Sequence, residues 1–149
     1  MRRLVLVAVA WWTAACAMHM DVPEGFLRLK GREIGDVKAV TADDARIWVR
    51  EFDVDQGASL EFWMRALRTE LEQARGYRLE PNEQEMVDAE GHKGRALEGT
   101  IAMGGEVRGY LIAVFPLGES KLRVAEFSAR QDLFAKHIDA VRKAVTTAR

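Results

Sequence analysis

The residues YLIAVF, Tyr110–Phe115, decide the fold, because they are apolar at every position. A β-strand places successive side chains on opposite faces of its sheet, so a strand that is apolar throughout has both faces covered. Turn residues bound the run, with Gly104-Gly105 before it and Pro116-Leu117-Gly118 after it. The sequence therefore predicts a sheet that lies between two covering layers.

Strands on either side of this run complete the predicted sheet. From Tyr77 to Phe127 apolar and polar residues alternate with a period of two, which is typical of β-strands. Turn residues divide this region into an antiparallel meander. The expected strands are residues 77–88, 94–103, 106–115 and 121–127. Shorter extended segments are expected at residues 26–30, 34–40 and 45–52.

Amphipathic helices supply the covering layers. The first is expected to begin at Ser59, a good N-cap, and to end at Gly76, because a left-handed cap favours glycine. Its apolar residues recur with a period of 3.6, at Leu60, Trp63, Met64, Leu67, Leu71 and Ala74. The last helix is expected after a capping box made by Ser128 and Gln131. These elements predict an α+β fold, an α/β/α sandwich on one mainly antiparallel sheet.

The composition is that of one near-neutral domain. The 149 residues include 22 Lys or Arg, 23 Asp or Glu and a single cysteine. Nucleic-acid binding requires a clustered excess of Lys and Arg, so it is not expected. A chain with one cysteine has no internal disulfide, and its core must be held by packing. We expect this α+β domain to span residues 25–149.

The N-terminal residues have the layout of an export signal. Arg2-Arg3 precede an apolar run from Leu4 to Trp12, and small residues lead to Cys16. We expect a signal peptide over residues 1–15, cleavage after Ala15, lipid attachment at Cys16 and a tether over residues 16–24. An uncleaved transmembrane anchor and secretion without a lipid remain alternatives, although the uncharged run is shorter than the roughly 20 residues that span a bilayer.

The residues around Cys16 resemble the lipobox of bacterial lipoproteins, although Thr13 stands where that motif usually has leucine. The resemblance implies a protein of the cell envelope that is bound to a membrane by its lipid. In Gram-negative lipoproteins, a residue such as Ala17 in place of an aspartate after the cysteine implies sorting to the outer membrane. The expected location is therefore the periplasmic face of the outer membrane.

The folded part of the chain resembles the PsbP/DcrB-like domain. The resemblance rests on Pro23–Phe26, on Met86–Gly91 leading into Gly94–Gly99, on Gly109–Ile112 and on the closing amphipathic helix. It implies an α/β/α sandwich that acts by binding other proteins without catalysis. No active-site residues are carried over from this family.

Residues that could support catalysis or metal binding are scattered. His19, His92 and His137 fall in a tether, a turn and a helix face, and no pair has the spacing of metal ligands. A weak metal contact at His92 is the alternative to a solvated hairpin. We therefore expect no enzyme activity, no metal and no cofactor, and we expect Trp48 and Trp63 to lie in the core.

One aromatic residue is out of place on the first helix. Phe62 falls opposite the apolar stripe, beside Arg65, so these two residues are candidate contacts for a protein partner. We favour the interpretation that the segment from Val22 to Leu29 folds back and covers Phe62. The expected function is that of a protein-binding accessory or scaffold subunit of an envelope complex, and the alternative is a periplasmic carrier of a lipid or small molecule.

Overall fold

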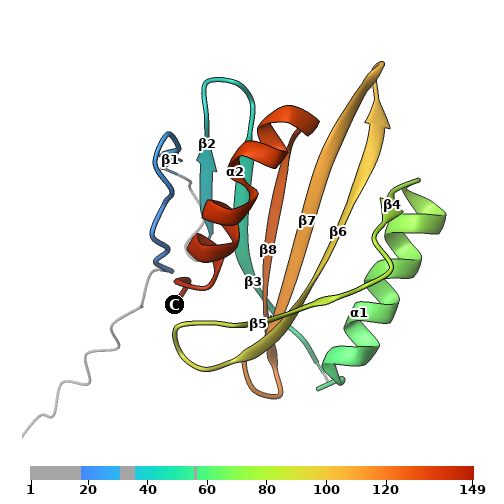
Figure 1. The fold of residues 1–149 in the computed structure, drawn as a ribbon. Coiled ribbons are helices and arrows are strands. Elements are labelled where there is room, and N and C mark those ends of the chain that lie inside the picture. Colours follow the sequence, from blue (N-terminus) through green and yellow to red (C-terminus); the bar gives the residue numbers. More distant parts are fainter. Residues whose placement is uncertain (1–17, 31–35, 56) are drawn as a thin grey trace, which may run out of the picture.

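The computed structural model describes residues 18–30, 36–55 and 57–149. This part of the chain forms one twisted sheet with a helix on each face (Figure 1). Ala15 and Cys16, the expected cleavage and lipid-attachment sites, lie outside the described residues. Within the described ranges, no helix has both the length and the apolar character that crossing a membrane requires.

The strands of the described residues pair antiparallel in the order β1-β2-β3-β8-β7-β6-β4, and β5 also pairs with β6. They are β1 (Leu27–Leu29), β2 (Val37–Val40), β3 (Arg46–Asp53), β4 (Arg78–Leu79), β5 (Gln84–Val87), β6 (Lys93–Met103), β7 (Glu106–Pro116) and β8 (Lys121–Arg130). β3 pairs with β8 along its whole length, from Arg46 opposite Ser128 to Asp53 opposite Lys121. This pairing joins the early strands to the predicted meander in a single sheet.

The helices lie on opposite faces of the sheet. α1 (Leu60–Thr69) continues into a π-helical turn, η1 (Glu70–Ala74), and α2 (Gln131–Val145) follows β8 directly. α1 covers β6 and β7, whereas α2 covers β7 and β8 from the other side (Figure 1). The Ser59 hydroxyl accepts a hydrogen bond from the Phe62 N–H, and Gly76 has a φ of 73°. Both predicted ends of this helical segment are therefore confirmed.

The apolar run of β7 is buried on both sides, as predicted. Its side chains divide between two clusters, with Leu111, Ala113 and Phe115 under α2 and Tyr110, Ile112 and Val114 under α1. Gly109 also faces α2, where an added Cβ would lie 2.2 Å from Cγ of Phe134. Only glycine allows α2 to approach the strand this closely, and the α+β sandwich is confirmed.

Two predicted elements differ from the structure. The expected strand 77–88 is divided into β4 and β5, because the segment between them contains Pro81, which cannot donate to a strand ladder. The expected capping box is wrong, because β8 continues to Arg130 and places Ser128 opposite Arg46 and Tyr110. Arg130 is the N-cap of α2, and its side chain makes no capping hydrogen bond.

The segment that we expected to be a tether packs against the domain from residue 18 onward. Met18 and Met20 are buried in the cluster under α2. The His19 N–H donates to the Arg149 carbonyl at 2.8 Å, and the Arg149 N–H donates to the His19 carbonyl at 3.0 Å. The chain therefore enters the domain beside its C-terminal residue.

Candidate functional site

The outer side of α1 presents an exposed aromatic side chain, that of Phe62. Its exposed fraction is 54%, and its ring makes an edge contact with Trp63, whose centroid lies 5.4 Å away. The segment that was expected to cover Phe62 packs elsewhere, because Val22 and Phe26 belong to the cluster under α2, on the opposite side of the sheet. The expectation that this segment shields Phe62 is therefore wrong.

A shallow groove of about 540 Å³ runs from Phe62 along α1 and η1. Its lining comprises Phe62, Arg65, Ala66, Thr69, Glu70, Gln73 and Ala74. The Arg65 guanidinium lies 3.3 Å from the Glu61 carboxylate, and both side chains are exposed. Aromatic side chains and arginine are both enriched in protein interfaces. We call this surface the α1 groove.

A second polar cluster surrounds Arg123, which is only 3% exposed. Its guanidinium donates to Asp88 at 2.9 Å, to Glu51 at 2.9 Å and to Glu90 at 3.2 Å. It also donates to the carbonyl oxygen of Ala148 at 2.7 Å. Arg123 therefore ties β8 to β3, to the hairpin between β5 and β6 and to the C-terminus.

The hairpin between β5 and β6 is organised by Asp88. Its carboxylate accepts hydrogen bonds from the backbone N–H groups of Glu90 and His92, and it lies 2.9 Å from the His92 ring nitrogen Nδ1. Burial alone would raise the pKa of Asp88, but these hydrogen bonds hold the pKa below its ordinary value. Asp88 is therefore a buried carboxylate whose charged form the surrounding hydrogen bonds stabilise.

The cluster also contains His92, for which a weak metal contact was the alternative to a solvated hairpin. One ligand atom from each of Asp88, Glu90 and His92 lies within 4.8 Å of the others. Arg123 already donates to both carboxylates, so the cluster contains a cation of its own. The arrangement is that of a structural ion-pair network. The burial of Arg123 was not predicted, although its position in β8, on the same face as Ala125 and Phe127, indicates it.

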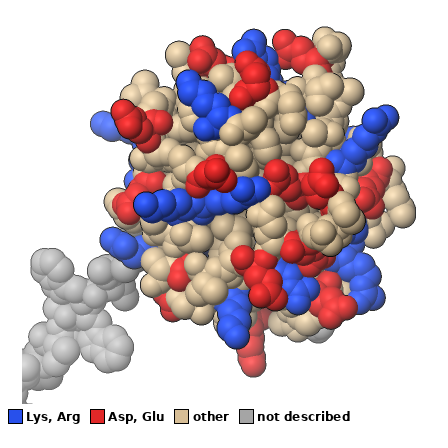
Figure 2. Space-filling view, in the orientation of Figure 1, with Lys and Arg blue, Asp and Glu red and all other residues tan. Residues whose placement is uncertain are grey.

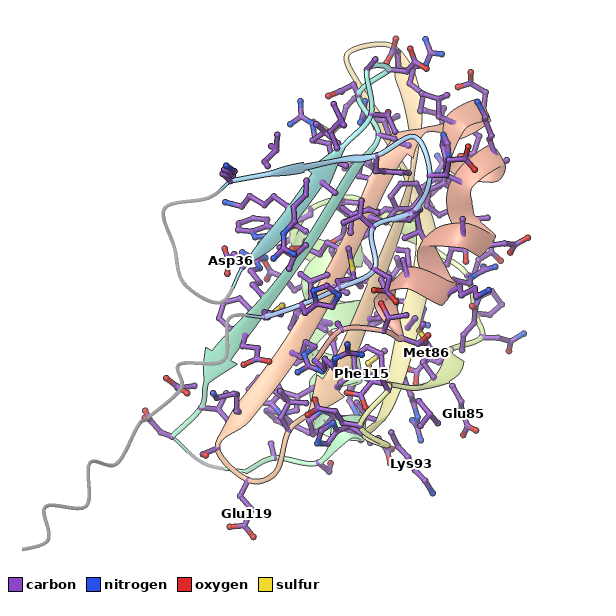
Figure 3. The ribbon with its side chains drawn as sticks, turned by 90° about the vertical axis from the view of Figure 1, so that its left-hand side faces the viewer. Asp36, Glu85, Met86, Lys93, Phe115 and Glu119 are labelled. Atoms are coloured by element: carbon purple, nitrogen blue, oxygen red, sulfur yellow. The ribbon has the colours of Figure 1, made fainter. Side chains whose placement is uncertain are left out.

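The half of the sheet made by β1, β2 and β3 has a face that α1 does not cover. We call it the open face and define it by Leu27, Leu29, Lys38, Val40, Arg46 and Trp48. These residues are next to one another in the strand register. The residues that alternate with them, including Val37, Ala39 and Ile47, are buried under α2. Figure 3, which looks onto the β1 edge, shows Asp36 on the same side, away from α2.

Trp48 lies on this open face and not in the core, which corrects our expectation. The Lys38 ammonium and the Arg50 guanidinium lie 4.4 Å and 3.7 Å from its ring centroid. Its indole N–H donates to Asp36 at 3.0 Å. Ile47 and Val49, the neighbours of Trp48 in β3, are buried under α2. Because successive side chains of a strand point to opposite faces, Trp48 must face away from α2. Trp63, in contrast, packs against the cluster under α1, as expected.

The other histidines are not brought together. His137 packs edge-on against Phe26 with a centroid distance of 5.2 Å, and exposed His19 lies 3.1 Å from Asp21. Charges of both signs are interspersed over the face shown in Figure 2. The described surface therefore offers two candidate contact regions, the α1 groove and the open face.

Comparison with known proteins shows the fold. The chain is similar to LpqN of Mycobacterium tuberculosis, with a TM-score of 0.69, 15% identity and coverage of 88% of this chain and 81% of that one. It is also similar to the cyanobacterial PsbP protein, CyanoP, of Synechocystis sp. PCC 6803, with a TM-score of 0.57, 17% identity and coverage of 97% and 98%. The chain therefore has a PsbP-like α+β fold, as the resemblance implied.

LpqN is involved in cell envelope biogenesis. A further similar structure is a protein of unknown function from Pseudomonas aeruginosa, with a TM-score of 0.53, 13% identity and coverage of 87% and 80%. No family model matches the sequence. No curated protein matches it by sequence either.

Proposed function

We propose that this protein is a lipid-anchored component of the cell envelope that binds a protein partner through the α1 groove, as an accessory subunit without catalysis. The leader supports the anchor, since Cys16 follows a basic pair, an apolar run and small residues. The envelope role of the structural neighbour LpqN is consistent with this setting. The proposed location is the periplasmic face of the outer membrane.

The observation that carries the partner-binding function is the exposure of Phe62. The hydrogen bond from its N–H to the Ser59 cap fixes Phe62 in the first turn of α1, at 3.1 Å. The apolar stripe of the same helix is turned toward the sheet, where Met64 and Leu71 are buried. The ring therefore projects from a rigid element, and burying it against a partner would remove apolar surface from water.

The carrier function is the second candidate from the sequence, and it requires apolar space between the sheet and a helix. That layer under α2 contains fully buried large side chains, including Phe115 and Phe127. Phe127 also stacks on Phe134 of α2 with a centroid distance of 5.1 Å. This packing argues against a carrier site under α2, and the apolar pocket under α1, beside Trp63 and Leu67, has a volume of only about 210 Å³.

The proposal is tested by purifying the protein with its partners from gently solubilised membranes and identifying them by mass spectrometry. We expect Phe62→Ser to lose a partner that the wild type retains. Met103→Ser is the matched control, because Met103 is 56% exposed on the hairpin between β6 and β7, and it should retain the partner. Cys16→Ser should move the protein into the soluble envelope fraction.

Three outcomes would contradict parts of this proposal. Equal recovery of every partner with the wild type and Phe62→Ser would remove the α1 groove from the function. Membrane retention of Cys16→Ser would favour the transmembrane alternative. A protein that elutes alone with a bound lipid would favour the carrier.

A further inference from the structure

The point at which the chain enters the domain is firmly held. Met18 is 5% exposed, and the backbone of the next residue, His19, pairs with Arg149. The Arg28 guanidinium of β1 also donates to the Met18 carbonyl at 3.0 Å. Residue 18 is therefore fixed beside β1, the edge strand of the sheet.

Little chain separates this fixed point from the proposed anchor. Cys16 is two residues before Met18, and an extended chain spans about 3.3–3.6 Å per residue. The lipid attachment point thus lies within about 7 Å of Met18. With so short a tether, a lipid on Cys16 would hold the β1 edge close to the membrane surface.

The β1 edge carries side chains that suit such a surface. Leu27 is 74% exposed and Leu29 is 47% exposed, although both are large apolar residues. They lie opposite Val40 and Lys38 of β2. A groove of about 550 Å³ extends from Leu29 across the open face to Trp48.

The open face also has the residue types of a membrane interface. Tryptophan prefers the boundary between apolar and aqueous layers, and Lys and Arg can bury their stems while their charges stay in water. Trp48 lies between the cations of Lys38 and Arg50. Arg28 and Lys30 add positive charge along the same edge, although Arg28, opposite Ala39, is on the α2 side of β1, and neither has an ion-pair partner within the described residues.

We propose that the β1 edge and the open face dock onto the phospholipid headgroup layer, with Leu27 and Leu29 inserted. This inference rests on the proposed lipid anchor at Cys16. It gives the domain one orientation, since four strands separate β1 from β6 in the sheet. α1 lies over β6 and β7, so the α1 groove is held away from the inserted edge and remains accessible to a partner.

The experiment labels the full acylated protein at one position and measures the depth of the label in vesicles. Leu29→Cys is labelled with an environment-sensitive fluorophore, and acylation of Cys16 leaves the new thiol as the only reactive one. The protein is reconstituted in phosphatidylethanolamine and phosphatidylglycerol vesicles that contain brominated lipids. Met103→Cys, at a residue 56% exposed on the distant β6–β7 hairpin, is the control position.

We expect the label at position 29 to shift to shorter wavelength and to be quenched by brominated lipid, since interfacial side chains lie about 5–10 Å deep at the headgroup boundary. The label at position 103 should show neither change. The second variant combines Leu27→Asp with Leu29→Cys and carries the same label at position 29. A carboxylate at position 27 opposes insertion, so the quenching should be lost while the protein still floats with the vesicles.

The remaining outcomes separate the two proposals. If the protein floats with the vesicles but the label at position 29 behaves like that at position 103, the docking surface is overturned and the anchor stands. If cross-linking through position 29 joins two copies of the chain in place of lipid quenching, the open face is a self-association surface and the inference is overturned. If mass spectrometry finds Cys16 unacylated and the protein does not float, both proposals fail.

Discussion

The two halves of the sheet differ in how completely they are covered. β6, β7 and the adjoining part of β8 lie between α1 and α2, and the run Tyr110–Phe115 is buried on both sides. β1, β2 and the first residues of β3 pack only toward α2, and their other face carries Leu27, Leu29 and Trp48. We call these the covered half and the half-open half.

The difference indicates that one half of the sheet mainly stabilises the fold, whereas the other half offers surface for contacts with other molecules. Burial of apolar surface is the dominant favourable contribution to folding, so the covered half should determine most of the free energy of unfolding. Large apolar side chains that remain exposed contribute little to that free energy and are available to other molecules. The comparison therefore predicts different mutational responses in the two halves.

The largest effect is expected for Phe127→Ala on β8. Phe127 is fully buried and stacks on Phe134, so removing the ring should lower the free energy of unfolding by about 3–5 kcal/mol. Leu29→Ala is the control from the half-open half, where the side chain is 47% exposed, and it should cost about 1 kcal/mol or less. Urea denaturation measures both, and equal losses would contradict the comparison.

An intermediate effect is expected for Asp88→Asn, which weakens the network that joins the hairpin, β3 and the C-terminus. Loss of hydrogen bonds to a buried charge should cost about 1.5–3 kcal/mol at neutral pH. Because the pKa of Asp88 is lowered in the folded protein, this stabilisation is present above the ordinary value of 3.8 and is lost as the pH falls through the lowered pKa.

Thermal denaturation over a range of pH values tests this prediction. The stabilities of the wild type and Asp88→Asn should converge in acid. Asp139→Asn, at a side chain that is 93% exposed, should match the wild type at every pH. A difference between wild type and Asp88→Asn that persists unchanged at the lowest pH would show that the carboxylate charge is not the cause.

The smallest effect is expected for Leu27→Ser on the edge of the half-open half. Leu27 is 74% exposed, so the free energy of unfolding of the protein in solution should change by no more than about 0.5 kcal/mol. Differential scanning calorimetry in the absence of membranes checks this. A larger loss would indicate that the chain itself covers this residue, and the half-open description would need to be replaced.

Local features of the sequence predicted the local structure well. The unbroken apolar run Tyr110–Phe115 requires burial on both faces of its strand, and the Ser59 cap and Gly76 mark the ends of a helical segment by their own backbone chemistry. The prediction was wrong at Ser128, where pairing with strands on both sides extends β8 and overrides the local capping pattern.

The candidate site was predicted only in part. Phe62 was found because it breaks the helical stripe, which is visible in one segment of sequence. The burial of Arg123 and the open-face position of Trp48 depend on which strand lies beside another and which helix covers it. These are long-range relations that no local pattern contains.

The sequence by itself determined the helix stripes and the strand alternation, because each depends on neighbouring residues and on the fixed periods of helix and strand. Only the tertiary structure decided that β3 pairs with β8, that His19 pairs with Arg149 and that one face of β1–β3 stays open. The physical reason is that these contacts join distant parts of the chain, and they form where the total apolar burial of the whole domain is most favourable.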